Sequence, residues 1–265
     1  MTHVKTAVAG LREIADGYFE MTFDWPPFLE PPVPGQFFTV RPSASTVPLL
    51  RRPFAFSAFS GEKAGFIFER RGEGTQILAG KRPGDTLDVL GPLGNCFPEP
   101  APGRRPILIA GGIGVGPIYY YAASLAARGF RPLMVVGARS ADSLASPTIM
   151  GRVDAVSTTY DALVETVICT DDGSVGFCGT PIDYLARQDE DSNCEFFLCG
   201  PHGLLAAGHF LANEWGVPAW VSMEQTMGCA VGACMGCAVR VHGDRQYARV
   251  CTEGPIFESK EIVWT

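Results

Sequence analysis

Short apolar runs separated by turn residues fill the first hundred residues of the chain. The runs at 4–9, 18–23, 36–40, 54–59 and 65–70 are rich in β-branched or aromatic side chains, which favours strands. Turn residues such as Asp16-Gly17 and Pro34-Gly35 separate these runs. Because no helical periodicity intervenes, the pattern predicts an N-terminal antiparallel β-barrel.

A different pattern follows the proline-rich segment 98–103, which we interpret as a linker. Continuous apolar runs at 106–110, 132–136, 166–170 and 195–199 predict buried strands. Helices are predicted over 118–127, starting at Pro117, after the capping sequence Thr180-Pro181-Ile182-Asp183, and after Pro201. The stretch 141–160 is weakly periodic and is predicted only as loosely helical. Strands that alternate with helices predict an α/β doubly wound parallel sheet.

The longest uncharged stretch, 106–127, has 22 residues, which is enough to span a bilayer. It contains four glycines and an internal proline, so a strand, a glycine loop and a helix explain it better. We therefore predict three units, residues 1–101, 102–220 and 221–265.

The formal net charge of −7 argues against non-specific binding to nucleic acid, because neutralising phosphates needs an excess of Lys and Arg. The chain has nine cysteines, an odd number, and no export signal is visible. A disulfide framework is therefore not expected. We predict a cytoplasmic protein in a reducing compartment.

Four of the nine cysteines lie close together near the C-terminus, as Cys229-x4-Cys234-x2-Cys237 followed by Cys251. This is the spacing of plant-type [2Fe–2S] sites, and the interleaved glycines let the backbone aim N–H groups at the sulfides. A structural zinc site is the alternative. Zinc sites usually pair two Cys-x-x-Cys knuckles, whereas only Cys234 and Cys237 form one here. We therefore predict an iron–sulfur cluster.

A glycine loop joins the first apolar strand of the second unit to the following helix. Its glycines are Gly111, Gly112, Gly114 and Gly116, and its exposed amides and helix dipole suit a pyrophosphate. Tight strand–helix turns also use glycine, and Pro117 departs from the usual fingerprint. The position at the first βα turn favours a dinucleotide site.

Cys199-Gly200-Pro201 follows the last clear strand of the predicted sheet. Ligands bind beyond the carboxyl ends of such strands, so Cys199 is a candidate to face a nicotinamide; a buried apolar cysteine is the alternative. Arg139, after the second strand, is placed to meet a 2′-phosphate, but an arginine there does not establish a preference for NADP.

In the barrel half, Arg51 and Arg52 precede aromatic strand residues. An arginine binds a phosphate through two hydrogen bonds while an aromatic ring packs on a flavin. An exposed arginine pair beside ordinary core aromatics is the alternative. The segment Gly72-Glu73-Gly74-Thr75 is typical either of a phosphate-binding loop or of a hairpin turn.

Together these motifs resemble the electron-transfer subunits of class 1B dihydroorotate dehydrogenases, in the ferredoxin reductase-like superfamily. The resemblance runs nearly end to end. The cysteine loop and the run Val250-Cys251-Thr252-Glu253-Gly254-Pro255-Ile256-Phe257 are its specific part. It implies FAD in the barrel (1–101), NAD in the α/β domain (102–220) and a [2Fe–2S] cluster in the small C-terminal domain (221–265). It also implies an FMN-containing catalytic subunit as partner, in a heterotetramer of two plus two, which serves pyrimidine biosynthesis.

Residue by residue, the resemblance implies that Arg52, Pro53, Phe54 and Ala55 line the flavin. It implies further FAD contacts at Ile67, Phe68, Glu69, Gly74 and Thr75, and cluster ligation by Cys229, Cys234, Cys237 and Cys251.

Three departures from the family pattern affect flavin electronics more than flavin binding. Ala55 stands where serine is usual, so a hydroxyl contact is lost or shifts to Ser57. Glu69 replaces an expected basic residue, although Arg70 adjoins it, and Cys96 replaces a usual glycine and places a thiol near the flavin.

Two other functions are compatible with these motifs. One is an NAD(P)H-acceptor oxidoreductase subunit of a bifurcating ferredoxin oxidoreductase or a hydrogenase complex, since the reductase core is common to all. The other is a nucleotide-binding redox sensor without turnover. Flavin, nicotinamide and cluster motifs in one chain disfavour the sensor.

Overall fold

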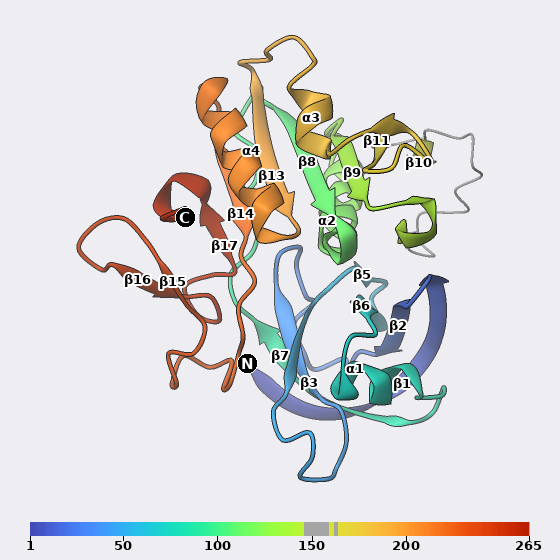
Figure 1. The fold of residues 1–265 in the computed structure, drawn as a ribbon. Coiled ribbons are helices and arrows are strands. Elements are labelled where there is room, and N and C mark those ends of the chain that lie inside the picture. Colours follow the sequence, from blue (N-terminus) through green and yellow to red (C-terminus); the bar gives the residue numbers. More distant parts are fainter. Residues whose placement is uncertain (146–158, 162–163, 265) are drawn as a thin grey trace.

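A curled antiparallel sheet forms the N-terminal part of the computed structural model, which describes residues 1–145, 159–161 and 164–264 (Figure 1). The strand order is β4-β3-β7-β1-β2-β6-β5. The strands are β1 (Thr2–Ala15), β2 (Tyr18–Asp24), β3 (Phe37–Arg41), β4 (Arg52–Ala55), β5 (Ala58–Phe59), β6 (Lys63–Glu69) and β7 (Thr86–Leu93). The interior is aromatic: Phe38 lies 5.2 Å from Phe23 and 5.1 Å from Phe66, between ring centroids. The predicted antiparallel barrel is confirmed.

One local prediction for the barrel is wrong, and one of two open alternatives is excluded. The run 54–59 is not one strand, because Phe56 N donates to Gln36 O and Ser57 N donates to Gly65 O, so the chain crosses from one edge of the sheet to the other. The hairpin turn considered at Gly72-Glu73-Gly74-Thr75 is instead the start of helix α1 (Glu73–Ala79). This helix buries Leu78 completely against the barrel core.

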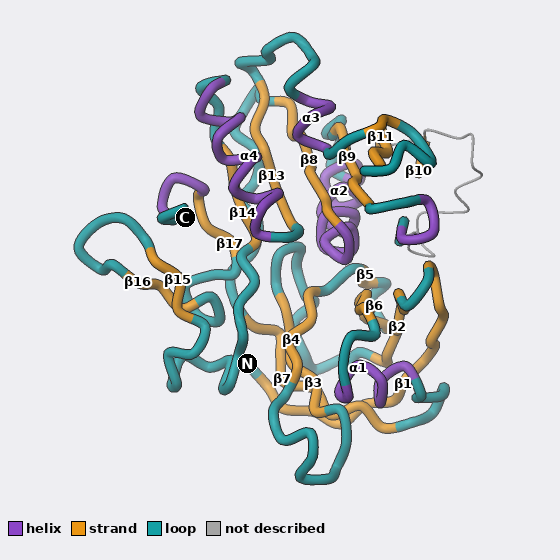
Figure 2. Tube along the Cα trace, viewed as in Figure 1, coloured by secondary structure: helices purple, strands orange, loops and turns teal. Residues whose placement is uncertain are grey.

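The second part is a mainly parallel sheet with the order β10-β11-β9-β8-β13-β14-β17, in which β17 (Ile256–Glu258) comes from the C-terminal segment. Its strands are β8 (Arg105–Gly111), β9 (Leu133–Ala138), β10 (Thr159–Asp161), β11 (Val164–Thr170), β13 (Cys194–Cys199) and β14 (Ala219–Ser222), and β12 (Phe177–Cys178) pairs with β11. Ile107 and Ile109 pack in one core cluster and Leu108 and Ala110 in another. Helices therefore cover both faces, which confirms the doubly wound sheet (Figure 2).

The helices of this part are α2 (Val115–Ala127), α3 (Pro181–Leu185) and α4 (His202–Glu214), with short 3-10 turns at Gly112–Gly114 and Ala141–Ser143. Helix α2 begins two residues before Pro117, which lies in its first turn, where proline's missing N–H costs nothing. The cap of α3 is confirmed, because Asp183 N donates to Thr180 Oγ1 at 3.1 Å.

The loose helix predicted for 141–160 is only partly comparable with the structure. A short 3-10 turn forms at Ala141–Ser143, but strand β10 begins at Thr159, so the prediction of a helix is wrong there. Residues 146–158 of that prediction lie outside the described part of the chain.

The C-terminal segment holds β15 (Ala238–Arg240) and β16 (Tyr247–Arg249), which form a small antiparallel pair, and a 3-10 turn at Ser259–Glu261. Its strand β17 (Ile256–Glu258) joins the large sheet by antiparallel pairing with β14. The boundary predicted near residue 221 stays a prediction, and this strand links the third predicted unit to the second. None of the helices within the described residues is long and apolar enough to cross a membrane.

Candidate functional site: a cleft between barrel and sheet, and a cysteine loop beside it

A cleft of about 860 Å³ lies where the barrel, the parallel sheet and the C-terminal segment meet. Its barrel wall includes Pro53, Phe54, Ala55, Ile67 and Glu69. Its sheet wall includes Gly111, Gly112, Gly114, Cys199, Gly200 and Pro201. Residues predicted separately for flavin and for nicotinamide therefore line one continuous space, as transfer of electrons between the two would require.

Five of the residues predicted for the flavin and NAD sites do not line this cleft. Phe68 is buried in the barrel core, and Gly116 packs against the barrel, where a Cβ would lie 3.0 Å from Ser57 Cβ. Arg52, Gly74 and Thr75 form a separate group beside helix α1, because a Cβ on Gly74 would lie 3.1 Å from Arg52 Nε. The Thr75 hydroxyl accepts from Gly72 N at 3.2 Å.

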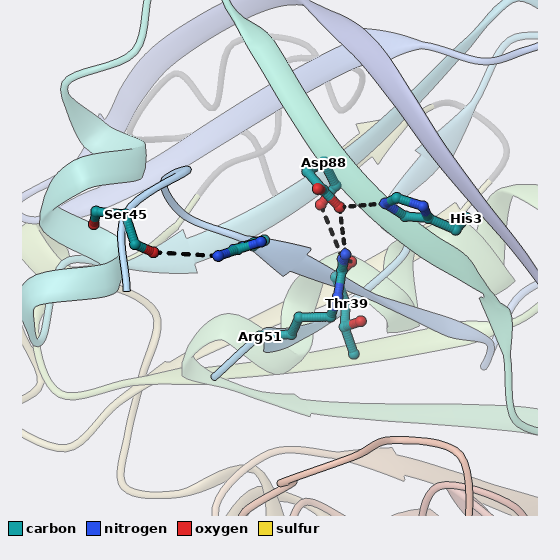
Figure 3. A network of polar contacts seen from close by, with 6 residues as sticks. His3, Thr39, Ser45, Arg51 and Asp88 are labelled. Carbon is teal, nitrogen blue, oxygen red and sulfur yellow. Dashed lines mark hydrogen bonds and ion pairs between the residues drawn. The ribbon is translucent and has the colours of Figure 1, made fainter. Parts of the chain in front are cut away.

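The two arginines of the barrel motif have different environments, and Figure 3 shows that of Arg51 beside Asp88. Arg51 forms an ion pair with Asp88 and donates to the carbonyl oxygen of Asp88 at 3.2 Å. Partial burial opposes ionisation of Asp88, but hydrogen bonds from Arg51 and His3 outweigh it and hold its pKa below the ordinary value. Arg52 donates to the Leu50 carbonyl and has no carboxylate partner among the described residues. Arg52 is thus the arginine left for an added anion.

The three departures from the family pattern are resolved differently. Ser57 does not line the cleft; it is buried against Gly116, so it does not replace the hydroxyl missing at Ala55. The cation beside Glu69 is Arg71, whose Nε lies 2.5 Å from the Glu69 carboxylate and which lines the cleft. Cys96 is exposed and lies outside the cleft lining.

Within the glycine loop, one glycine brings the sheet wall together. A Cβ on Gly114 would lie 2.2 Å from the carbonyl oxygen of Cys199, so only glycine allows the two loops to touch. Gly112 has a φ of +55°, and a Cβ there would meet nothing within 4 Å, so its backbone conformation and not a close contact favours glycine.

The Cys199 thiol is uncharged at neutral pH. Burial raises its pKa to about 12, although a hydrogen bond from Ser222 opposes the shift. Ser222 and Glu224 line the cleft beside it. The neutral thiol therefore adds no charge to this wall of the cleft.

The cysteine loop follows directly from the cleft wall. Backbone N–H groups of Val231, Ala233 and Cys234 donate to Cys229 Sγ at 3.3–3.5 Å. The amide of Val231 is the largest cause that lowers the pKa of Cys229, to about 6, and the thiolate is the form that binds iron. Ala230 and Met235 have positive φ values of 60° and 59°, which curl the loop around its sulfurs.

The four thiols are arranged two and two. Side-chain hydrogen bonds join Cys234 to Cys229 and Cys251 to Cys237. A cluster of two irons takes two thiolates at each iron, and this paired arrangement of the four thiols fits a [2Fe–2S] cluster.

An arginine outside the predicted set holds the loop to its fourth cysteine. Arg249 Nη1 donates to Gly232 O at 2.8 Å, and its guanidinium pairs with Glu253 through both carboxylate oxygens. The pair lowers the pKa of Glu253 to about 2. The spacing of Arg249 and Glu253, i and i+4 around Cys251, was a signal available in the sequence.

Other cleft residues were missed. Met223, Met227 and Pro255 line it from the cysteine-bearing segment, and Asp171 lines it beyond β11. The first three carry no chemical motif, and their position depends on how β17 pairs with β14.

Comparison with known proteins agrees with this geometry. Residues 224–263, which include all four cysteines, match the family model of the iron–sulfur cluster binding domain of dihydroorotate dehydrogenase B. A solved structure of an NADH-dependent reduced ferredoxin–NADP oxidoreductase superposes with a TM-score of 0.81 at 28% identity, over 98% of this chain and 90% of that one. Phthalate dioxygenase reductase shares the fold, with a TM-score of 0.64 at 18% identity, over 91% of this chain and 87% of that one.

Fold and cleft thus define a ferredoxin reductase-like oxidoreductase that uses FAD, NAD and a [2Fe–2S] cluster. The electron transfer subunits of dihydroorotate dehydrogenase B (NAD(+)) from Desulforamulus reducens and Bacillus caldolyticus are 37% and 38% identical to this chain. The matches cover 97% and 98% of this chain, and the same shares of the relatives. The chain belongs to this family of electron transfer subunits.

Proposed function

We propose that this chain carries electrons between NAD and a separate catalytic subunit that contains FMN and oxidises dihydroorotate to orotate. Two copies of each subunit assemble in the cytoplasm. The observation that carries the proposal is the shared cleft: flavin-side strands, nicotinamide-side loops and the start of the cysteine segment line one space. Near-complete coverage of relatives named as electron transfer subunits supports it.

The site residues divide by cofactor in this proposal. Pro53, Phe54, Ala55, Ile67 and Glu69 contact the flavin ring, and Arg52, with Gly74 and Thr75, binds the FAD phosphates. The glycine loop binds the NAD pyrophosphate, and Cys199-Gly200-Pro201 lies at the nicotinamide. Cys229, Cys234, Cys237 and Cys251 bind the cluster. Bound FAD supplies the exchange between single electrons and a hydride pair.

The chain's own residues position these groups. Gly114 allows the glycine loop to contact Cys199, and this contact fixes the position of the sheet wall of the cleft. Arg51 is neutralised by Asp88, so Arg52 is the arginine of this pair that has no carboxylate partner among the described residues. Backbone amides around Cys229 stabilise negative charge on the sulfurs, which favours a reduced cluster.

The partner is proposed to dock over the exposed edge of the cysteine loop. Cys234 is exposed, and the apolar side chains of Val231 and Met235, on either side of it, are 39% and 52% exposed. Apolar side chains rimmed by polar surface are typical of protein interfaces. Electrons then enter at the loop and leave at the cleft.

The test is the complex purified from the native host, mixed anaerobically with dihydroorotate. We expect bleaching of both the flavin and the cluster absorbance. Cys234→Ser is expected to abolish bleaching of FAD by dihydroorotate while leaving bleaching by NADH. Cys178→Ser, an exposed cysteine outside the loop, is the matched control and should behave as wild type. Wild-type complex that NADH bleaches but dihydroorotate does not would refute the proposed partner.

A second candidate function rests on the likeness to the NADH-dependent reduced ferredoxin–NADP oxidoreductase. That function predicts turnover with reduced ferredoxin and a partner other than an FMN dehydrogenase. Reduction of NADP by ferredoxin in the host complex, without any response to dihydroorotate, would favour it.

A further inference from the structure

The loop after the last barrel strand is hydrogen-bonded to the segment that follows Cys251. Asn95 N donates to Gly254 O at 2.7 Å, and Asn95 Nδ2 donates to Glu253 O at 3.0 Å and Ile256 O at 2.8 Å. Ile256 N donates back to Asn95 Oδ1 at 2.9 Å. One side chain thereby uses both amide donors and its acceptor on a segment about 160 positions away.

The same contact is closed by glycine packing. Gly94 has a φ of +73°, and a Cβ there would lie 2.6 Å from Pro255 Cδ and 2.9 Å from Phe37 Cε1. Pro255 and Phe37 both line the cleft. The barrel loop and the segment therefore meet at the wall of the proposed flavin site.

The segment held by Asn95 is also attached to the cysteine loop and to the sheet. Glu253 pairs with Arg249, which binds the loop carbonyl of Gly232. On the other side, Ile256 pairs with Ser222 of β14, and Met223 N donates to Pro255 O at 2.8 Å. Barrel, sheet and cysteine loop thus converge on the short stretch 253–256.

We propose that Asn95 is a positioning residue for electron transfer: it fixes the cluster-binding segment against the flavin barrel and so sets the separation of the two redox sites. Since electron tunnelling falls steeply with distance, loosening this contact slows transfer without changing either cofactor. The inference rests on the electron route proposed above. Asn95 lies at the surface, so its substitution removes no core packing.

The experiment compares Asn95→Ala with wild type as cofactor-loaded full chains. Hydrogen exchange of the Gly254, Ile256 and Phe257 amides should accelerate on the order of tenfold, because several neutral hydrogen bonds are lost. After NADH is mixed anaerobically in a stopped-flow instrument, flavin bleaching should keep its rate. Cluster bleaching, which takes one electron from the reduced flavin, should slow by a similar factor. The cluster potential should not move.

Asn95→Asp keeps the acceptor for Ile256 N but places a carboxylate oxygen against the carbonyl oxygens of Glu253 and Ile256, so it should slow cluster bleaching at least as much as Asn95→Ala. Asn193→Ala is the matched control: its amide donates to Gly103 O at 2.8 Å, near the opposite end of β13 from the cleft. It should leave cluster bleaching unchanged.

Wild-type cluster bleaching in Asn95→Ala would overturn the inference even if exchange accelerates. A shifted cluster potential would also overturn it, because Asn95 would then act on the cluster itself. Loss of FAD or iron from both Asn95 variants would overturn it too, since the contact would be needed for assembly. Wild-type chain whose cluster is never reduced by NADH would instead refute the electron route.

Discussion

Gly114→Ala tests the contact between the two loops of the sheet wall. The added methyl would lie 2.2 Å from the carbonyl oxygen and 2.5 Å from the carbonyl carbon of Cys199, both backbone atoms that have no free rotation to yield. Gly114 has a φ of −61°, so alanine is not strained there and the effect is purely steric. The Cys199-Gly200 backbone must retreat by about 1 Å, and displacements of that size cost on the order of 100-fold in rate.

The assay is NADH oxidation with ferricyanide by the FAD-loaded chain, with FAD content and the unfolding midpoint measured alongside. We expect kcat/KM for NADH to fall about 100-fold while FAD stays bound. Gly203→Ala is the control, because it lines the same cleft but its Cβ would meet nothing within 4 Å. Wild-type NADH kinetics in Gly114→Ala would refute the steric reasoning. An equal loss in Gly203→Ala would show that any methyl in the cleft obstructs the cofactor.

Three further predictions concern charge, burial and the cysteine loop. Asp171→Asn should lower the ratio of kcat/KM for NADH to kcat/KM for NADPH about tenfold. The reason is that the Asp171 carboxylate lines the cleft beside the end of β9, where it repels a 2′-phosphate. Cys194 is buried and burial raises its pKa to about 12, above the unfolded value near 9. The stabilisation from the protonated thiol is therefore complete below pH 9 and declines by about 1.4 kcal/mol per pH unit up to pH 12. Urea unfolding of wild type and Cys194→Ala at pH 8 and pH 10 measures this, and the free energy of unfolding should fall less between the two pH values in the variant. Arg249→Met should shorten the lifetime of bound iron in air several-fold at unchanged FAD content, because Gly232 O and Glu253 lose their shared partner. The measurement is the iron content per chain as a function of time in air.

The parallel sheet was predictable because its strands need nothing beyond local sequence. Strands buried on both faces appear as continuous apolar runs, and the helix cap joins Thr180 and Asp183, which are only three positions apart. Helix α1 was not predictable in this way. Gly72 and Gly74 indicate a turn, and the helix is stabilised by burial of Leu78 in a barrel that forms from distant strands. Tertiary burial here outweighs the low helix propensity of glycine.

The same distinction between local and long-range contacts applies to the candidate site. The spacing of the cysteines was informative because a cluster loop wraps its ligands locally, and its amides reach the sulfur of Cys229 from only two to five residues away. The resemblance implied Arg52, but the physical distinction between Arg51 and Arg52 was not available from the residue pattern. It depends on Asp88, which β3 and β7 bring beside Arg51 through antiparallel register. Likewise Asn95 looks like a loop residue until β17 pairs with β14 and places 253–256 against it. Candidate cofactor residues were therefore visible in local motifs, whereas the contact between Asn95 and residues 253–256 forms only when separate units pack.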